Sequence, residues 1–335
     1  MENRFVAVIG CGTWGRNIVR NFYNLGALHS VCDLNCENLA TVKGLYPEIP
    51  TTSDFQEVLD NPAINAVCIV TPSHTHFSLV RAALMKGKHV YVEKPISTVA
   101  QEAHELNKIA KSKDLVLMVG HLLLYHPAVN RLQMLVAQGV LGEIKYVQSD
   151  RLNINYFKND RSVMWDLAPH DISMTAYVIG SEPKRVISAN GCASDGGNIF
   201  DITHLTIEFE NGAIGQISDS WIHPQKRVVL LVRGDKATAI LDDTLSENKL
   251  QVYDNATPGS KSIETFDYLE IEPLKLECQH FIDCINKSKT PRSDGENGLM
   301  TVKVLEEAEE ILLNNYNIGR KNLDKVDFAT YRMEK

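Results

Sequence analysis

The feature that most constrains this chain is a glycine pattern that follows an apolar run near its beginning. Residues 6–15 read VAVIGCGTWG, and a helix-like run, NIVRNFYNLGA, follows. In such a pattern Gly10 permits a tight turn, Gly12 lets the backbone approach a pyrophosphate, and Gly15 lets the helix pack against the strand. The pattern therefore predicts the first turn of a dinucleotide-binding domain. The alternative is a glycine turn inside an ordinary α/β domain.

An acidic residue completes the pattern. Asp33 ends a second apolar run, HSVCD, about twenty residues after the glycines. Its carboxylate can accept both hydroxyls of an adenosine ribose, whereas it would repel a 2′-phosphate, and no Arg or Lys lies between Asp33 and Lys43. We therefore expect NAD rather than NADP. The expected cofactor contacts in this region are Gly10, Gly12, Thr13, Trp14, Gly15 and Asp33.

The composition limits the class of protein. With 335 residues and 44% apolar content, the chain is long enough for two domains. No apolar run approaches the roughly 20 residues that span a bilayer, and the first residues enter a strand-like run without room for a signal peptide. The net charge of −8 comes without a basic stripe. We therefore expect a soluble protein with neither membrane nor nucleic-acid partners.

The cysteines indicate the redox environment. They are seven, an odd number, and several stand in apolar runs: Cys11, Cys32, Cys36, Cys68, Cys192, Cys278 and Cys284. Buried thiols in a reducing cytosol explain this distribution better than a disulfide framework does. We therefore expect a cytoplasmic protein.

The first part of the chain alternates strand-like and helix-like segments. In chain order these are 65–72, 78–88, 89–95, 100–113 and 115–121, the first a strand. Such alternation predicts a parallel, doubly wound sheet. We therefore expect an NAD-binding Rossmann domain over residues 1–121.

After about Gly142 the chain becomes rich in strands. The strand-like runs lie within 144–153, 185–191, 203–221 and 227–242, and helical patterns occupy 166–179, 274–289 and 298–315. Asn211-Gly212 and Gly234-Asp235 are typical hairpin turns, which predicts antiparallel pairing. We expect an α+β domain over residues 122–335, with an open antiparallel sheet against which the helix near 166–179 packs.

Three short motifs fall where the strands of the first domain end, the edge at which such sheets bind ligands: TPSHTH, EKP and GH. Within EKP, Lys94 can hydrogen-bond a substrate hydroxyl and stabilise negative charge on its oxygen. The alternative is a solvated lysine at a turn, and Pro95 is a candidate for a cis peptide bond. The expected cofactor contacts here are Thr71, Pro72, Ser73, His76, Glu93, Lys94 and His121.

The pair His74-x-His76 raises the alternative of a zinc site. A third ligand at a recognised spacing is missing from the sequence. A loop beside the nicotinamide explains both histidines, so we expect no metal.

A further motif heads the helix near 166–179. Asp166 is typical of a helix N-cap, Pro169 fits a first turn, and Asp166 lies close enough to His170 to orient its ring. An imidazole that titrates near neutral pH suits a base that removes the proton of an alcohol. The alternative is a capping aspartate with a structural histidine.

The motifs resemble one known family in their order along the chain. They are Gly10-x-Gly12-x-x-Gly15, TPSHTH, Glu93-Lys94-Pro95, Asp166-x-x-x-His170 and the closing HFIDCINKSKTPRSDGENGL. Together they resemble the Gfo/Idh/MocA oxidoreductases over essentially the whole chain. The resemblance implies Lys94 and His170 as catalytic residues, with Asp166 supporting the histidine. It also implies a homo-oligomer, dimer or tetramer, formed through the open sheet.

The same oligomer is expected from two strands of the second domain. Residues 203–209 and 227–234 carry more apolar side chains than one sheet face against a single helix can bury. Exposed apolar patches of that size are uncommon on monomers. We therefore expect another copy of the chain to cover the open face.

Within the family, the segments VGHLLLYHPAVNRL, YVQSDRLN and WDLAPHDISM are most similar to UDP-N-acetylglucosamine 3-dehydrogenases. This resemblance implies oxidation of the sugar 3-hydroxyl to a ketone. It also implies a coupled aminotransferase that aminates the ketone for lipid A biosynthesis.

Two departures bear on the substrate. Many polyol-oxidising members carry an Arg where this chain reads Leu122 to Tyr125, and often an Asp where it has Ser173. Such a site suits a nucleotide-sugar better than a free inositol or hexose. The candidate substrate contacts are Arg151, Asn153, Arg161 and Trp165. The alternatives are a free polyol or inositol dehydrogenase and a non-catalytic NAD-responsive sensor, which would not need Lys94, Asp166 and His170 together.

Overall fold

The computed structural model describes residues 4–154, 162–194, 199–256, 264–265, 268 and 270–323. The chain forms two compact units, each with its own sheet. The first unit comprises Met1–Met134 and Asp267–Lys303, and the second comprises Leu135–Phe266 and Val304–Lys335. A single domain boundary between residues 121 and 122 is expected from the sequence, and it stays a prediction. By their contacts, residues 267–303 belong to the first unit.

The first unit is built on a parallel sheet of six strands. They are β1 (Val6–Ile9), β2 (Leu28–Cys32), β3 (Thr51–Thr52), β4 (Ala66–Ile69), β5 (His89–Glu93) and β6 (Leu117–Gly120). Their order is β3-β2-β1-β4-β5-β6, and every pair is parallel. The order reverses between β1 and β4, which is where doubly wound sheets bind ligands. The predicted Rossmann fold is confirmed.

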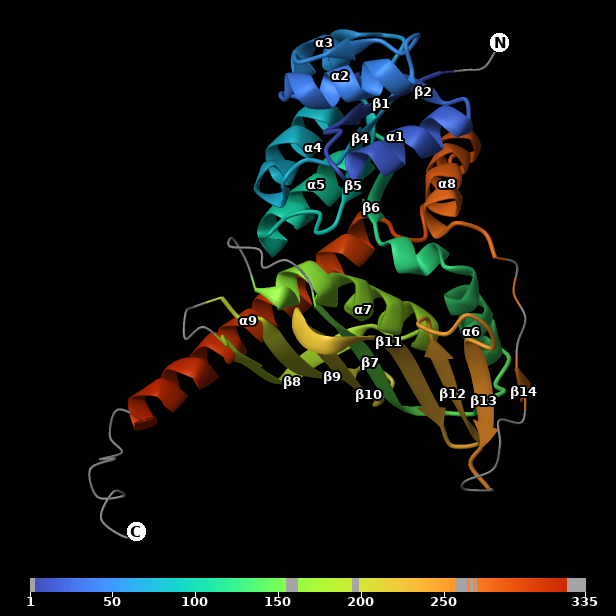
Figure 1. The fold of residues 1–335 in the computed structure, drawn as a ribbon, viewed down its shortest axis with the longest axis vertical. Helices are drawn as coiled ribbons and strands as arrows, with labels where there is room; N and C mark the ends of the chain where they lie inside the picture. Colours follow the sequence, from blue (N-terminus) through green and yellow to red (C-terminus); the bar gives the residue numbers. More distant parts are fainter. Residues whose placement is uncertain are drawn as a thin grey trace. The chain divides into compact units, whose positions relative to one another are not determined.

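Helices cover both faces of this sheet. They are α1 (Gly15–Asn24), α2 (Cys36–Leu45), α3 (Phe55–Asp60), α4 (His76–Met85), α5 (Ala100–Ser112) and α8 (Pro273–Lys287), with the short 3-10 helices η1 (Ser73–Thr75) and η2 (Leu122–Tyr125). Figure 1 shows α4 and α5 side by side on one face and α1 and α8 on the other. Every residue of β1, β4 and β6 is buried, as expected for a parallel sheet covered on both sides.

The segment after α8 attaches to the edge of the first sheet. The backbone N–H of Val119 donates to the Ser293 carbonyl over 2.7 Å, and the Ser293 hydroxyl donates to the Val119 carbonyl over 2.7 Å. The Tyr125 hydroxyl lies 2.9 Å from the same serine oxygen. These buried hydrogen bonds explain why this late segment belongs to the first unit.

The second unit contains a mixed sheet in the order β14-β13-β12-β11-β7-β10-β9-β8. The strands are β7 (Ile144–Ile154), β8 (Pro183–Cys192), β9 (Ile202–Phe209), β10 (Ile214–Ser220), β11 (Ile222–Gly234), β12 (Ala237–Asp242), β13 (Leu250–Asp254) and β14 (Glu264–Thr265). The two predicted hairpins join β9 to β10 and β11 to β12. Neighbouring strands of this sheet are antiparallel except β7 and β10, which are parallel.

Helices of the second unit lie on one face of its sheet. Figure 1 shows α7 (Val163–Ile179) and the later part of α9 (Gly295–Leu323) on the same side, and α6 (Pro127–Ala137) precedes β7 in the chain. The Asn315 side chain at the far end of α9 donates to the Ala189 carbonyl of β8 over 3.0 Å. Among the described residues, no helix covers the opposite face of this sheet.

The start of α7 differs from the prediction. Its N-cap is Ser162, so Asp166 lies one turn inside the helix and is not the cap. Pro169 is likewise in the helix interior, where its ring removes the N–H that would bond the Trp165 carbonyl. The helix begins earlier because Val163, Met164 and Trp165 are all buried, so packing stabilises an additional turn before Asp166. Its end is as predicted, at the left-handed Gly180.

The uncovered face of the second sheet is more polar than predicted. Along β9, Leu205, Ile207 and Phe209 are buried, whereas His204 is exposed and Thr206 is half-buried. The strict alternation sends the apolar side chains of this strand to the covered face. The expected apolar surplus on β9 is therefore wrong.

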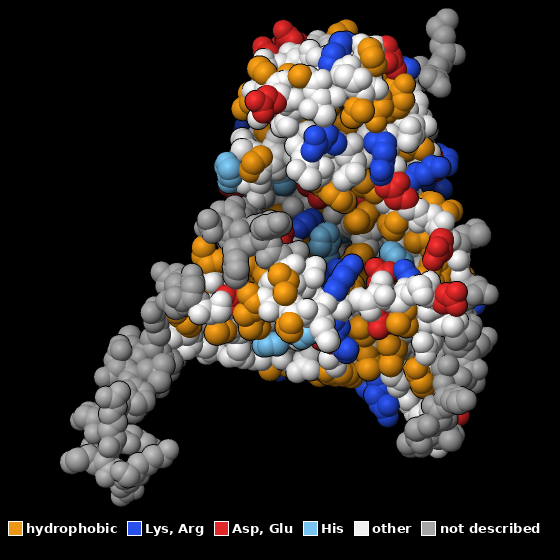
Figure 2. All heavy atoms as spheres, viewed as in Figure 1, with side chains coloured by type: hydrophobic (Ala, Val, Ile, Leu, Met, Phe, Trp, Pro, Cys, Tyr) orange, Lys and Arg blue, Asp and Glu red, His pale blue; other side chains and the backbone are white. Residues whose placement is uncertain are grey.

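Other properties expected from composition can be checked directly. Among the described residues, no helix is long and apolar enough to cross a bilayer. On the face shown in Figure 2, basic and acidic side chains are interspersed over the first unit. All seven thiols are free and five are buried, whereas Cys36 and Cys192 are exposed.

Candidate functional site

The glycine-rich turn between β1 and α1 has the geometry of a phosphate-binding loop. Gly10 has a φ of +92°, and a Cβ there would lie 2.7 Å from the Val70 carbonyl oxygen. A Cβ at Gly15 would lie 2.2 Å from the Gly10 carbonyl oxygen, so only glycine permits this contact. A Cβ at Gly12 would meet nothing within 4 Å. The backbone at Gly12 therefore borders open space, which fits the approach of a pyrophosphate.

Asp33 lies directly after β2 and faces this turn. Its carboxylate accepts hydrogen bonds from the backbone N–H of Cys11 over 2.7 Å and of Asn35 over 2.8 Å, and from the Asn38 amide over 3.2 Å. Partial burial acts to raise the pKa of Asp33, but these hydrogen bonds outweigh it and lower the pKa. The carboxylate is therefore charged and fixed, as a partner of ribose hydroxyls must be.

Glu93 links three loops at the carboxyl edge of the sheet. The Trp14 indole N–H donates to its Oε1 over 2.7 Å, and the backbone N–H of Lys94 donates to its Oε2 over 3.2 Å. A Cβ at Gly120 would lie 3.0 Å from the same carboxyl group. Burial raises the pKa of Glu93, and the Trp14 hydrogen bond opposes this. The sequence predicted Trp14 and Glu93 as separate contacts and missed the bond between them.

His76 joins the loop after β4 to the EKP loop. Its ring is buried, with Nδ1 at 2.7 Å from the Pro95 carbonyl oxygen and Nε2 at 2.8 Å from the Thr71 carbonyl oxygen. Both nitrogens thus face backbone carbonyl oxygens. Among the described residues, no group of three side chains could hold a metal ion. The histidine therefore positions these loops, and the peptide bond before Pro95 is cis.

The second unit carries the Asp166–His170 motif on α7. These residues are four apart, so they lie on the same side of the helix. The next residue, Asp171, is fully buried and accepts from Arg151 Nε over 2.7 Å and Nη2 over 2.9 Å. The Ser149 hydroxyl donates to the same carboxylate over 2.7 Å. This bidentate ion pair fixes the turn of α7 that carries His170 to strand β7.

The predicted substrate contacts have other partners in the structure. Arg151 is engaged by Asp171, and its side chain is 16% exposed. The Trp165 indole N–H donates to Glu309 of α9 over 2.9 Å, and the Asn153 side chain accepts from its neighbouring backbone N–H. Arg161 lies outside the described residues. A substrate role for these four side chains stays a prediction.

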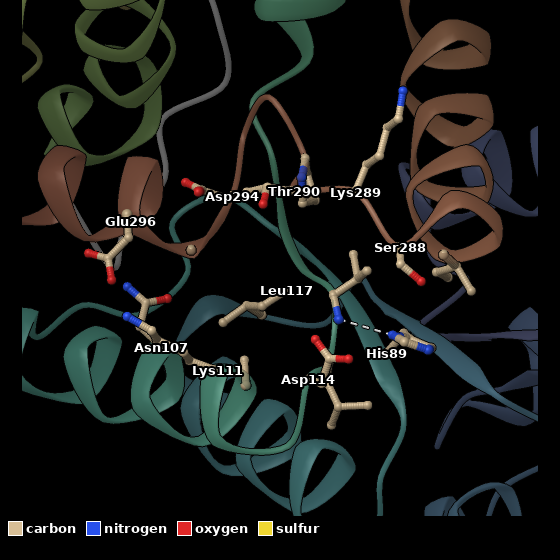
Figure 3. A pocket seen from close by; sticks show the side chains of 16 residues that line it. His89, Asn107, Lys111, Asp114, Leu117, Ser288, Lys289, Thr290, Asp294 and Glu296 are labelled. Carbon is tan, nitrogen blue, oxygen red and sulfur yellow. Dashed lines mark hydrogen bonds between the residues drawn. The ribbon is translucent and has the colours of Figure 1, made fainter.

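A cavity of about 420 Å³ lies at the opposite edge of the first sheet, where β5 and β6 begin (Figure 3). Its polar side chains do not converge on a common point. The Lys289 side chain extends away from the others, and the His89 ring accepts the Val116 N–H over 2.9 Å. Since ligands of doubly wound sheets bind at the carboxyl edge, this cavity is separate from the candidate site.

Comparison with known proteins decides the family. The oxidoreductase family with an NAD-binding Rossmann fold matches residues 4–121, and its C-terminal alpha/beta domain matches residues 133–310. The chain belongs to the Gfo/Idh/MocA oxidoreductase family. Members of this family are oxidoreductases, and the residues that match its NAD-binding Rossmann domain include the glycine turn and Asp33 described above.

Several relatives extend over most of this Gfo/Idh/MocA chain. The UDP-N-acetylglucosamine 3-dehydrogenase of Acidithiobacillus ferrooxidans is 28% identical over 304 residues, covering 87% of this chain and 91% of that protein. A solved structure of the enzyme of that name and organism has a TM-score of 0.81 at 26% identity, covering 92% and 97% of the two chains. The NAD-dependent scyllo-inositol 2-dehydrogenase of Bacillus subtilis is 26% identical over 250 residues, covering 72% and 73%.

Proposed function

We propose that this protein oxidises a secondary hydroxyl of a sugar to a ketone with NAD, and that its substrate is UDP-N-acetylglucosamine, oxidised at C3. The observation that carries the proposal is the match to a UDP-N-acetylglucosamine 3-dehydrogenase over 87% of this chain and 91% of that enzyme. The two family domains, matched over residues 4–121 and 133–310, include the NAD turn, Lys94 and the Asp166–His170 motif together. A protein that only senses NAD has no need for the last two.

The proposed chemistry divides between the two units. The Lys94 ammonium donates a hydrogen bond to the reacting hydroxyl and stabilises the charge that develops on its oxygen. His170 takes the hydroxyl proton, and Asp166 orients its ring. When bound, NAD supplies the hydride acceptor. Lys94 and His170 belong to different units, so their joint action on one hydroxyl is part of the proposal.

The turn after β6 supports a nucleotide-sugar. The residues Leu122 to Leu124 form an apolar turn, with Leu124 buried. The nearby Arg292 does not replace the arginine of polyol enzymes, because its Nη1 donates to the side chain of Asn130 over 2.6 Å and also to the Leu124 carbonyl. The turn of residues 122–125 thus carries no charged side chain that would suit a free polyol, and in this proposal binding energy from a UDP group compensates.

The test is a substrate panel. The protein is incubated with NAD and a set of UDP-sugars, free sugars and inositols, and formation of NADH is followed by absorbance. We expect UDP-N-acetylglucosamine to react fastest, with the carbonyl located at C3 by mass spectrometry after borohydride or amine trapping. Free N-acetylglucosamine should lose turnover as well as affinity, because the remote UDP group holds the sugar in line.

Three outcomes would contradict the proposal. Faster oxidation of an inositol would favour the polyol dehydrogenase, which the similarity to scyllo-inositol 2-dehydrogenase also supports. Binding of NAD without oxidation of any sugar would favour the sensor. A trapped carbonyl at C4 or C6 would refute the assigned carbon. Because the ketone is unfavourable at equilibrium, the proposal includes a coupled aminotransferase that consumes it. The proposal also includes a cytoplasmic location.

The protein is also proposed to be a homo-oligomer. No helix among the described residues covers the outer face of the second sheet, and Leu231 and Ile240 are half-buried on strands β11 and β12. A second copy would remove such side chains from water. Light scattering at micromolar concentration should give at least twice the chain mass of 37.5 kDa. A single species at the chain mass would refute this.

A further inference from the structure

Helix α7 lies on a layer of buried charged side chains in the second unit. The helix packs against strands β7, β9 and β10. Two carboxyl groups in this interface, those of Asp171 on α7 and Asp219 on β10, are fully buried. Arg151 on β7 is the register partner of Asp219 and forms two hydrogen bonds with Asp171. One guanidinium thus has a buried carboxyl group on the neighbouring strand and another on the helix.

The carboxylates of this layer keep Arg151 charged. Burial acts to lower the pKa of Arg151, but nearby carboxylates outweigh it and raise the pKa. Asp171 has the largest of these effects, and Asp219 and Asp243 add to it. The Ser149 hydroxyl, on the same face of β7 as Arg151, also donates to Asp171. The Asp171 carboxylate is therefore held by three hydrogen bonds from one strand.

Stability alone does not explain such a layer. Both charges of a buried ion pair must leave water, and the pair is often no more stabilising than apolar side chains of similar volume. A bidentate pair does supply direction, because its two parallel hydrogen bonds fix the angle as well as the distance between the partners. The layer is therefore best explained by the group whose direction it controls.

The turn of α7 that lies over this layer needs support from outside the helix. Pro169 lacks an N–H for the Trp165 carbonyl and crowds that carbonyl with its ring, so the hydrogen bonding of the helix is interrupted just before His170. Directly after His170, the Asp171 side chain attaches the helix to β7. His170 thus lies between a gap in the helical hydrogen bonds and a fixed point on the sheet.

We propose that Asp171 is a positioning residue that, through its ion pair with Arg151, sets the direction of the His170 ring for the reaction. This inference rests on the proposed function, in which His170 takes the hydroxyl proton. Asp171 is fully buried, so it acts through His170. Arg151 then supports the catalytic helix and does not bind the substrate.

Two variants separate the geometry of the pair from its charge. Asp171→Asn and Arg151→Lys both lose the bidentate geometry, so kcat with the best substrate of the panel should fall about 10- to 100-fold while KM stays near the wild-type value. Only Asp171→Asn removes a negative charge next to His170, which disfavours the imidazolium. The acid limb of the pH–rate profile should therefore move to lower pH in Asp171→Asn and stay in place in Arg151→Lys.

Asp150→Asn is the matched control. Asp150 is the neighbour of Arg151 on β7, so its side chain points to the opposite face of the sheet. There its buried carboxylate accepts from Arg227 Nε over 2.8 Å. The control thus breaks an ion pair of a buried carboxylate on the same strand, away from α7. It should lower the melting temperature and leave kcat and the pH–rate profile unchanged.

A second readout needs no turnover. NMR of the ligand-free protein with labelled histidine follows the titration of the His170 ring, whose signal is identified by its loss in His170→Gln. The ring should titrate at lower pH in Asp171→Asn than in wild type, and at the wild-type pH in Asp150→Asn. If wild type oxidised no sugar, the proposed function would fail, and this titration would still decide whether Asp171 controls His170.

Two results would overturn the inference. Wild-type kcat together with an unmoved His170 titration in Asp171→Asn would make the ion pair purely structural. A raised KM with unchanged kcat in Arg151→Lys would make Arg151 a substrate contact. Should Asp171→Asn fail to fold, Arg151→Lys decides: a lower kcat at unchanged KM supports the inference, and wild-type kcat overturns it.

Discussion

Lys94→Ala is expected to lower kcat by about 10²- to 10³-fold, the usual effect of removing one hydrogen-bond donor that stabilises charge developing on an oxygen. The Kd for NAD should change much less, because the glycine turn and Asp33 are separate from this side chain. The backbone N–H of Lys94 bonds to Glu93 and survives the substitution, so the loop keeps one of its contacts. Steady-state kinetics with the best substrate of the panel, together with NAD titration, measures both effects.

Lys86→Ala is the matched control. The ammonium of Lys86 pairs with Asp60 over 2.6 Å, and both side chains are about half exposed. Surface pairs of this kind contribute about 0–1 kcal/mol to stability, so kcat should stay at the wild-type value. If Lys94→Ala also retained wild-type turnover, Lys94 would be a solvated lysine at a turn.

Asp33→Ala combined with Leu34→Arg is expected to move cofactor preference toward NADP by about ten- to a hundredfold in kcat/KM. The first change removes the carboxylate that repels a 2′-phosphate, and the second supplies a cation for it. Leu34 is 88% exposed, so an arginine fits there without disturbing the core. The preference is measured as the ratio of kcat/KM for the two cofactors.

Asp33→Ala should also cost stability. Its carboxylate accepts backbone hydrogen bonds from Cys11 and Asn35, and loss of such an acceptor costs about 1–3 kcal/mol where the donor stays buried. Leu34→Arg alone is the control and should keep the NAD preference, since Asp33 still repels the phosphate. Equal use of NADP and NAD by the wild type would show that Asp33 does not select the cofactor.

Several parts of the fold were predictable because their causes are local. The six parallel strands follow from short apolar runs that alternate with helical patterns. The positive φ of Gly10 and of Gly212 follows from turns that only residues without a Cβ adopt easily. The end of α7 at Ile179 was predicted from the helical pattern of residues 166–179. In each case the deciding residues lie within a few positions of one another.

Other features of the second unit were not predictable. The start of α7 was placed too late because Asp166 looks like a cap, whereas burial of the residues before it extends the helix. The parallel pairing of β7 with β10 joins strands that are far apart in the chain. The outer face of β9 is polar because its register, and not its composition, decides which side chains are buried.

The sequence by itself determined the Rossmann unit, the NAD turn with Asp33 and the motifs that contain Lys94 and His170, because each depends on spacing along a few residues. Only the tertiary structure decided the partners of the polar side chains. Trp14 and Glu93 are 79 positions apart, and Arg151 and Asp171 are 20 apart. Hydrogen bonds require atoms within about 3 Å in a given direction. No pattern in the chain specifies such distances between remote residues.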